Sequence, residues 1–189
     1  SLHTARSRNH FATLLGTLAI VALATVNCDP DTGPNPSARI TMSATINGAA
    51  WQASTADHGV PPYANWFPWD STLAISGIRA YGSDSSLSIV LVLGSVTGPG
   101  TFALGDRNSQ SYGAVLLATG DIYAHTYKVR WYYTDATTGG SATVTGFDPA
   151  TRHLDGTFSF TARDSLGQLR QVTQGVFAGT YILPPDLRR

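Results

Sequence analysis

The stretch RITMSATINGAAW, residues 39–51, decides the fold class of this 189-residue chain. Apolar and polar residues alternate over its first eight positions, which is the pattern of a half-buried β-strand. The apolar face carries Ile40, Met42, Ala44 and Ile46. Asn47-Gly48 follows and predicts a type I′ turn, because both central residues of that turn need a positive φ. Trp51 then begins the return strand, so the domain opens on a β-hairpin.

Short strand-like segments recur from here to residue 182, separated by turn residues such as Gly98-Pro99-Gly100. They cover residues 72–81, 86–93, 101–104, 111–118, 122–134, 141–148, 154–162 and 171–182. The segment 86–93 is apolar on both faces and predicts a central strand. In 122–134 the alternation places Tyr123, His125, Tyr127, Val129, Trp131 and Tyr133 on one face. We expect an all-β domain over residues 39–183, with a short tail at 184–189. It has nine or ten strands in an antiparallel β-sandwich or an up-and-down barrel.

The charge composition disfavours binding to polyanions. Twelve Lys and Arg balance twelve Asp and Glu, so the formal net charge is zero and no long-range field attracts nucleic acid. All the acidic residues are Asp, and Lys128 is the only lysine. Because Glu and Lys are strong surface helix formers, long exposed helices are not expected.

The first 27 residues have the pattern of a secretory signal peptide. Arg6 and Arg8 precede an uncharged run over residues 11–26. As a helix this run spans about 24 Å, which is shorter than the hydrocarbon core of a bilayer at about 30 Å. A stable transmembrane span is therefore the weaker interpretation.

Cys28 is the only cysteine of the chain and directly follows the apolar run. The sequence Thr25-Val26-Asn27-Cys28 resembles a bacterial lipobox, which implies that Cys28 is acylated and becomes the mature N-terminus. Lipoboxes usually carry Leu where Thr25 stands and a small residue where Asn27 stands. Cleavage after Ala24, leaving a lone thiol in a secreted protein, and a buried structural cysteine are the alternatives. Residues 28–38 are rich in Pro and read as an extended tether.

Two groups of segments resemble a known family. The first is ATINGAAW at 44–51, and the second comprises 144–148, LDGTFSFTA at 154–162, and Gly175-Val176-Phe177. They resemble a family of uncharacterised bacterial lipoproteins that is defined as a domain of unknown function. The resemblance implies secretion, a location in the cell envelope and an all-β domain, and it implies no reaction.

No arrangement of polar residues predicts catalysis or a cofactor. His58, His125 and His153 lack metal-ligand spacing, and no Gly-x-Ser-x-Gly nucleophile motif occurs. Four carboxylates could serve a glycosidase but lie near turns, where Asp commonly bonds its own backbone. These are Asp57, Asp70, Asp121 and Asp135. We therefore predict no catalytic residue, no metal site and no cofactor.

The segment VPPYANWFPWD, residues 60–70, is unusually aromatic and is expected to be a loop. Stiff, aromatic loops suit ligand binding, because Trp and Tyr bury a large area with few rotatable bonds. The candidate binding residues are Trp51, Tyr63, Trp66, Phe67 and Trp69. The alternative is an aromatic plug that caps the core, which avoids the aggregation liability of exposed rings.

These features favour a noncatalytic, lipid-anchored envelope protein that binds a small molecule, glycan or protein and contacts the membrane through Cys28. A structural component of the cell surface and a secreted hydrolase without a recognisable motif are the alternative functions. A secreted soluble form is the alternative location.

Overall fold

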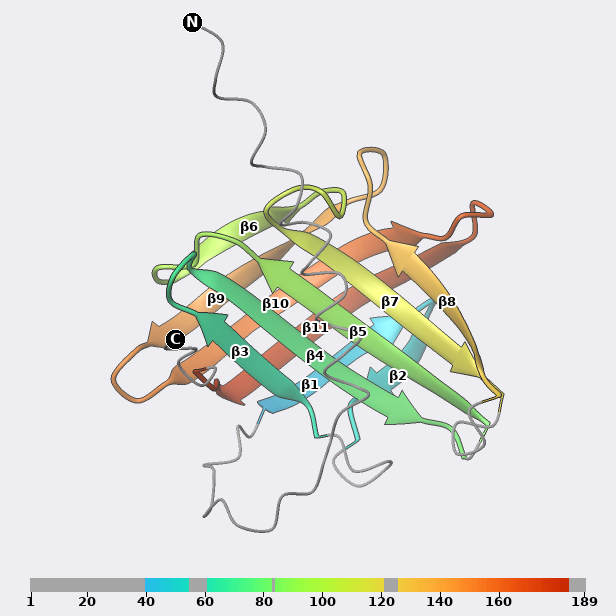
Figure 1. Cartoon of the computed structure of the whole chain (residues 1–189), viewed down its shortest axis with the longest axis horizontal. Helices are drawn as coiled ribbons and strands as arrows, with labels where there is room; N and C mark the ends of the chain where they lie inside the picture. Colours follow the sequence, from blue (N-terminus) through green and yellow to red (C-terminus); the bar gives the residue numbers. More distant parts are fainter. Residues whose placement is uncertain (1–39, 55–60, 83, 121–125, 184–189) are drawn as a thin grey trace, which may run out of the picture. The chain divides into compact units, whose positions relative to one another are not determined.

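The computed structural model describes residues 40–54, 61–82, 84–120 and 126–183. These residues form an all-β structure of eleven strands, without a helix (Figure 1). The strands are β1 (Ile40–Ile46), β2 (Ala49–Gln52), β3 (Tyr63–Phe67), β4 (Thr72–Ala80), β5 (Ser85–Leu93), β6 (Gly100–Leu104), β7 (Tyr112–Thr119), β8 (Lys128–Tyr133), β9 (Gly140–Asp148), β10 (His153–Arg163) and β11 (Leu169–Thr180). The predicted all-β class is confirmed, with slightly more strands than expected.

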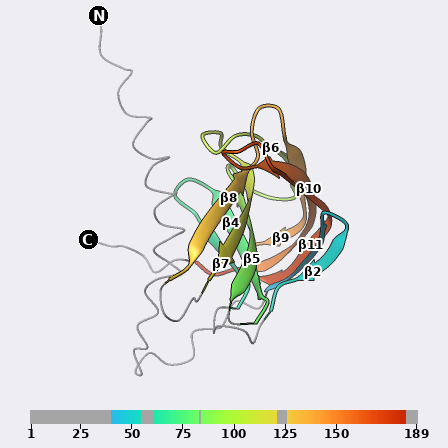
Figure 2. The same ribbon diagram turned by 90° about the vertical axis from the view of Figure 1, so that its right-hand side faces the viewer.

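All eleven strands belong to one antiparallel sheet that branches at β10. Along most of its length β10 pairs with β9, but at its end Arg163 pairs with Tyr133 of β8. The first layer therefore contains β2, β1, β11, β10, β9 and β6, and the second layer contains β8, β7, β5, β4 and β3. The two layers face each other, and their strands cross (Figures 1 and 2).

The sheet is open. Its path runs from β2 to β3, and these end strands do not pair with each other. Beyond β4, β3 makes only an isolated bridge from Asn65 to Ile182. Of the two predicted architectures, the β-sandwich is the one that this open, two-layered sheet matches.

The opening hairpin is confirmed in detail. Asn47 and Gly48 have φ angles of 48° and 81°, as a type I′ turn requires. All four apolar residues of β1 are buried, and its alternate residues point outward. The expected central strand is confirmed as well, because β5 lies between β4 and β7.

The core lies between the two layers and is one continuous apolar cluster. The first layer contributes Met42, Leu154, Phe158 and Phe177, among others, and the second contributes Leu73, Ile75, Leu91 and Tyr132. Trp51 of β2 links the layers directly, since its indole Nε1 donates a hydrogen bond to the carbonyl oxygen of Leu87 in β5 over 3.1 Å. The fold is thus a sandwich held by side chains that cross from one layer to the other.

The aromatic segment was wrongly expected to be a loop, because Tyr63–Phe67 forms strand β3. Its residues pair with β4 from Tyr63 opposite Ser76 to Phe67 opposite Thr72. Two prolines, Pro61 and Pro62, precede the strand, where the missing N–H groups break no ladder. These two prolines therefore mark the beginning of an edge strand and not an irregular loop.

Several sequence-based predictions fall outside the described residues. They concern the signal peptide 1–27, the tether 28–38 with Cys28, the tail 184–189, and Asp57, His58, Asp121 and His125. The compact unit Ser37–Arg189 holds every described strand and the whole core cluster. Within the described ranges, no helix has the length and apolar character needed to cross a membrane.

Candidate functional site

Two of the five predicted binding residues are built into the packing of the sandwich. Trp51 is only 2% exposed. Trp66 is half-buried, donates from Nε1 to the Val96 carbonyl oxygen over 3.3 Å, and packs edge-on against Phe147 and Tyr181. These two indoles pack against the core.

The other three predicted residues lie on the outer side of β3 and just beyond its end. Tyr63 and Phe67 alternate with the inward-facing Ala64 and Trp66 of β3. Burial raises the pKa of the Tyr63 hydroxyl, and a hydrogen bond with Ser76 opposes that shift. Trp69 is 60% exposed and contacts Phe67 edge-on at 5.2 Å between ring centroids. The five residues therefore do not converge on one site.

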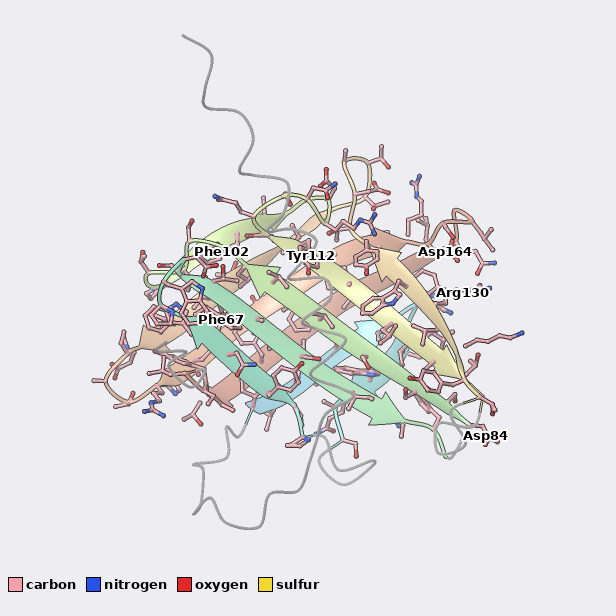
Figure 3. All side chains as sticks on the ribbon, in the orientation of Figure 1. Phe67, Asp84, Phe102, Tyr112, Arg130 and Asp164 are labelled. Carbon is pink, nitrogen blue, oxygen red and sulfur yellow. The ribbon has the colours of Figure 1, made fainter. Side chains whose placement is uncertain are left out.

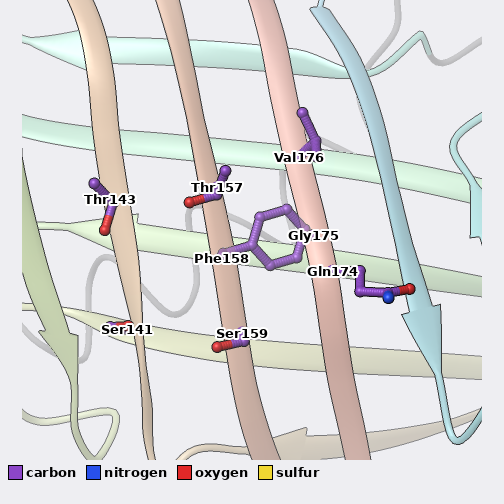
Figure 4. Close-up of a pocket in the computed structure, with 8 residues that line it drawn as sticks. All are labelled: Ser141, Thr143, Thr157, Phe158, Ser159, Gln174, Gly175 and Val176. Carbon is purple, nitrogen blue, oxygen red and sulfur yellow. The ribbon is translucent and has the colours of Figure 1, made fainter.

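A hollow of about 360 Å³ lies on the outer face of the first layer, over β9, β10 and β11 (Figure 4). We call it the hydroxyl hollow. Its walls are Ser141 and Thr143 of β9, Thr157 and Ser159 of β10, and Gln174 and Val176 of β11, with Phe158 and Gly175 as its floor. The register places Thr157 opposite Thr143 and Ser159 opposite Ser141, so the four hydroxyl side chains form two neighbouring rows.

A β-bulge shapes one wall of the hydroxyl hollow. Phe158 pairs with Gly175 but Phe160 pairs with Val172, so β11 carries an additional residue there. Gln174 lies in this bulge with a φ of 52°, and its Oε1 accepts a hydrogen bond from the Thr45 hydroxyl over 3.1 Å. The bulge therefore fixes a polar amide beside the rows of hydroxyls.

Most hydroxyls of the hollow remain available. Thr143 shares a hydrogen bond with Thr101 at 3.0 Å. Within the described part of the chain, the side chains of Ser141, Thr157 and Ser159 make no hydrogen bond. They can both donate to and accept from a bound molecule.

A second hollow, of about 590 Å³, lies over β6 and the loops around it, and three of its four hydroxyls, those of Thr101, Ser109 and Ser111, are already engaged. Ser109 Oγ lies 2.6 and 2.7 Å from the carbonyl oxygens of Asp106 and Ser111, which share its one proton. Ser111 Oγ accepts from the amide of Gly94 over 3.0 Å. These hydroxyls hold the loops in place, so the hydroxyl hollow is the better candidate site.

The carboxylates expected in turns bond their local backbone wherever the structure describes them. Asp70 Oδ1 accepts from the amide of Thr72, and Asp135 Oδ1 accepts from the amides of Thr137 and Thr138. The Thr137 hydroxyl, followed by these amides, holds the pKa of Asp135 well below its usual range. Asp148 has a lowered pKa for the same kind of reason, chiefly through Thr151. The turn interpretation is confirmed for Asp70 and Asp135.

One histidine–carboxylate pair lies on the surface, where His153 Nε2 and Asp155 Oδ1 are 2.8 Å apart. Both side chains are well exposed. In the described ranges, no group of three His, Cys, Asp or Glu side chains is placed to hold a metal ion.

Comparison with known proteins identifies the family of this chain. Residues 39–180 match the family model described as "Domain of unknown function (DUF6252)". The chain belongs to this family. No curated protein and no solved structure matches the chain. The DUF6252 match begins at the first strand and ends with the last one, so it includes the sandwich and the hydroxyl hollow.

The hydroxyl hollow of this DUF6252 domain was missed by sequence reasoning. Its only sequence sign is the alternation of Ser and Thr at 141, 143, 157 and 159, which resembles any solvent-facing strand surface. The hollow depends on the register of β9 and β10 and on the bulge at Gln174, and no local sequence pattern predicts either of them.

Proposed function

We propose that this DUF6252 protein is a noncatalytic binding protein of the bacterial cell envelope, anchored through Cys28, that takes a small glycan in the hydroxyl hollow. The observation that carries the proposal is the group of uncommitted hydroxyls at Ser141, Thr157 and Ser159 beside the Gln174 amide.

The chemistry of the hollow suits a sugar. Hydroxyl and amide groups donate and accept hydrogen bonds in the same way as sugar hydroxyls, and neither ionises near neutral pH. The exposed Val176 side chain in the wall of the hollow can lie against the C–H groups of a pyranose ring. The volume of about 360 Å³ is at the lower end for ligand pockets, about 300–1,000 Å³.

The hollow is formed on the outer face of one layer, so a bound sugar keeps one side in water. Such a ligand gains few buried contacts, and we expect dissociation constants of about 1 mM for single sugars. A glycan chain that continues along the sheet would bind more tightly through additional hydroxyl contacts.

Titration of the protein with hexoses, N-acetylhexosamines and their disaccharides, followed by amide NMR shifts, tests the hollow. We expect shifts at Ser141, Thr157, Ser159 and Gln174. Thr157→Val removes one hydroxyl and should weaken binding about fivefold, whereas Thr161→Val, on the same strand outside the hollow, should leave it unchanged. Shifts confined to other surfaces, or equal effects of the two variants, would reject the glycan site.

The proposed anchor has a separate test. Mass spectrometry of the mature protein from a bacterial envelope should find an acylated N-terminal Cys28. An unmodified terminus at Thr25 would support the secreted form and remove the anchor from the proposal.

A further inference from the structure

Strand β6 ends the first layer, and one of its two edges is free. Among the described strands, β6 pairs with β9 alone (Figure 1). In an antiparallel ladder, successive residues turn their N–H and C=O groups alternately to the two sides. Gly105, just after β6, donates its N–H to the Ser111 carbonyl oxygen, on the side away from β9. Thr101 and Ala103 alternate in step with Gly105, so their backbone groups point to that side as well.

The outward backbone groups of Thr101 and Ala103 have no partner within the described ranges. Outside the ladder with β9, no described backbone group bonds to either residue, and both residues are exposed. Proteins usually protect such an edge with charged side chains, proline or a covering segment. The strand Gly100–Leu104 contains neither a charged residue nor proline. Its edge is therefore open to pairing.

The other two end strands of the sheet are protected. On β3, the Ile182 carbonyl oxygen accepts from the Trp66 amide over 3.0 Å, and the Ile182 amide donates to the Ala64 carbonyl oxygen over 2.8 Å. On β2, which has only four residues, the Arg79 guanidinium donates to the Ala50 carbonyl oxygen over 3.2 Å. Of the three ends, β6 is the one that the described chain leaves uncovered.

A groove runs along the free edge of β6. It is the second hollow, of about 590 Å³, and we call it the edge groove. Its one side is β6, with Phe102 labelled in Figure 3, and its other side is a wall formed by residues 94–95 and 109–111. Ser111 Oγ accepts from the Gly94 amide, so the wall is fixed before a ligand binds. None of the ten lining residues is charged.

We propose that the edge groove binds an extended, uncharged polypeptide segment of a partner protein, which adds a strand to the first layer beside β6. A polypeptide in the β conformation presents backbone donors and acceptors at every second residue, which matches those of Thr101 and Ala103. Phe102, between them, is half-buried against the core, so an apolar side chain of the segment can pack on its ring. Because the groove is uncharged, binding should not depend on salt.

A second copy of the chain fits this edge less well than a single extended segment. Ser111 already occupies the position of a neighbouring strand next to Gly105. A second copy would bring the same wall, together with its own β9, to this place. A single segment needs only the space between β6 and the wall.

The probe is an acetylated and amidated heptapeptide in which threonine and valine alternate. Titration of isotope-labelled protein with this peptide is followed by amide NMR. We expect the amide signals of Thr101 and Ala103 to shift, and their hydrogens to exchange about tenfold more slowly with saturating peptide.

Two alanine-to-proline variants separate this edge from the others. Ala103→Pro removes an outward N–H without breaking the ladder with β9, and it should weaken binding about tenfold. Ala50→Pro is the matched control, because Ala50 is also an exposed alanine of an end strand and turns its backbone outward, toward Arg79. It should leave binding unchanged. The heptapeptide methylated at every backbone nitrogen gives a second test on the unaltered protein, and it should not bind.

Shifts at Thr101 and Ala103 that Ala103→Pro removes and Ala50→Pro retains would support the proposal. The absence of these shifts, equal binding by Ala103→Pro and the wild type, or binding of the methylated peptide would overturn it. The same shifts on concentrating the protein without peptide would also overturn it, since they identify a second copy as the occupant. Sugar binding is a separate result, because the edge groove and the hydroxyl hollow share no residue.

Discussion

The two layers of the sandwich share a core but differ in the residues that their outer faces carry. On the first layer, outward positions are mainly Thr, Ser and Gln, as at Thr143, Thr157 and Gln174. On the second layer they are mainly aliphatic and aromatic, as at Val90 and Trp131. The inner faces of the two layers therefore determine the fold, while the residue types on the two outer faces can differ.

In the second layer, strand β5 is apolar on both faces over residues 89–93. Such a strand is usually covered on both sides. In β5 the inward residues Ile89 and Leu91 pack in the core, while Val90 and Val92 belong to the outer face. Val92 is only 6% exposed and Val90 is half-buried, so β5 is shielded on this side as well.

The largest effect on stability is expected in the first layer, at a glycine where an added methyl group has no space. A Cβ on Gly156 would lie 2.2 Å from the Thr143 carbonyl oxygen and 2.3 Å from Phe177 Cζ. We expect Gly156→Ala to lower the free energy of unfolding by about 3 kcal/mol or more, measured by urea denaturation.

Its control is Gly77→Ala in the second layer. That Cβ would meet the side chains of Ala53, Met42 and Trp51 at 2.9 to 3.1 Å, and Met42 can adjust its thioether. A loss of about 1 kcal/mol is expected. Equal losses of stability at the two glycines would show that the Met42 side chain does not adjust to the added methyl group.

A second comparison sets Trp51, which joins the layers, against the exposed Trp69, which follows β3. Trp51→Phe removes the hydrogen bond to Leu87 and leaves a small cavity, so it should cost about 2 kcal/mol of unfolding free energy. Trp69→Ala should change stability by less than about 0.5 kcal/mol. Thermal and urea unfolding of both variants measure this, and a larger loss for Trp69→Ala would place that ring in the core.

Local features of this fold were predictable because they depend on neighbouring residues. Ile40–Ile46 and Asn47-Gly48 specify a strand and its turn through side-chain alternation and backbone φ alone. β3 was missed because the prolines before Tyr63 read as a loop. The aromatic stack of Trp131 on Tyr133 follows from their common face on β8, which the alternation predicted.

The candidate site was not predictable in the same way. The hydroxyl hollow combines β9, β10 and β11, and a one-residue change in register would move each hydroxyl to the other face. The branch at β10 depends on a single pairing, between Arg163 and Tyr133, which no local pattern encodes. Sequence reasoning therefore identified strands and their faces but could not identify which faces meet.

The core between the layers offers a smaller test, at Tyr132. Its side chain is fully buried, and its hydroxyl has no hydrogen-bond partner in the described structure. Since an unsatisfied buried hydroxyl is unfavourable, Tyr132→Phe should leave stability unchanged or raise it by about 1 kcal/mol. Tyr181→Phe should behave alike, because its hydroxyl is also unpartnered among the described residues. A clear loss of stability in thermal unfolding of either variant would contradict this assignment.

The smallest effect concerns Asp135, in the loop that leads from β8 in the second layer to β9 in the first. Its pKa is lowered on folding, so its contribution to stability is present above the unfolded pKa of about 4 and is lost as pH falls toward the folded value. Asp135→Asn should therefore flatten the decline of the urea midpoint between about pH 5 and pH 2. Thr137→Val removes the donor that lowers the pKa most and should flatten that decline in part. If both variants follow the wild-type acid profile, the hydrogen bonds to the Asp135 carboxylate do not contribute to the pH dependence of stability.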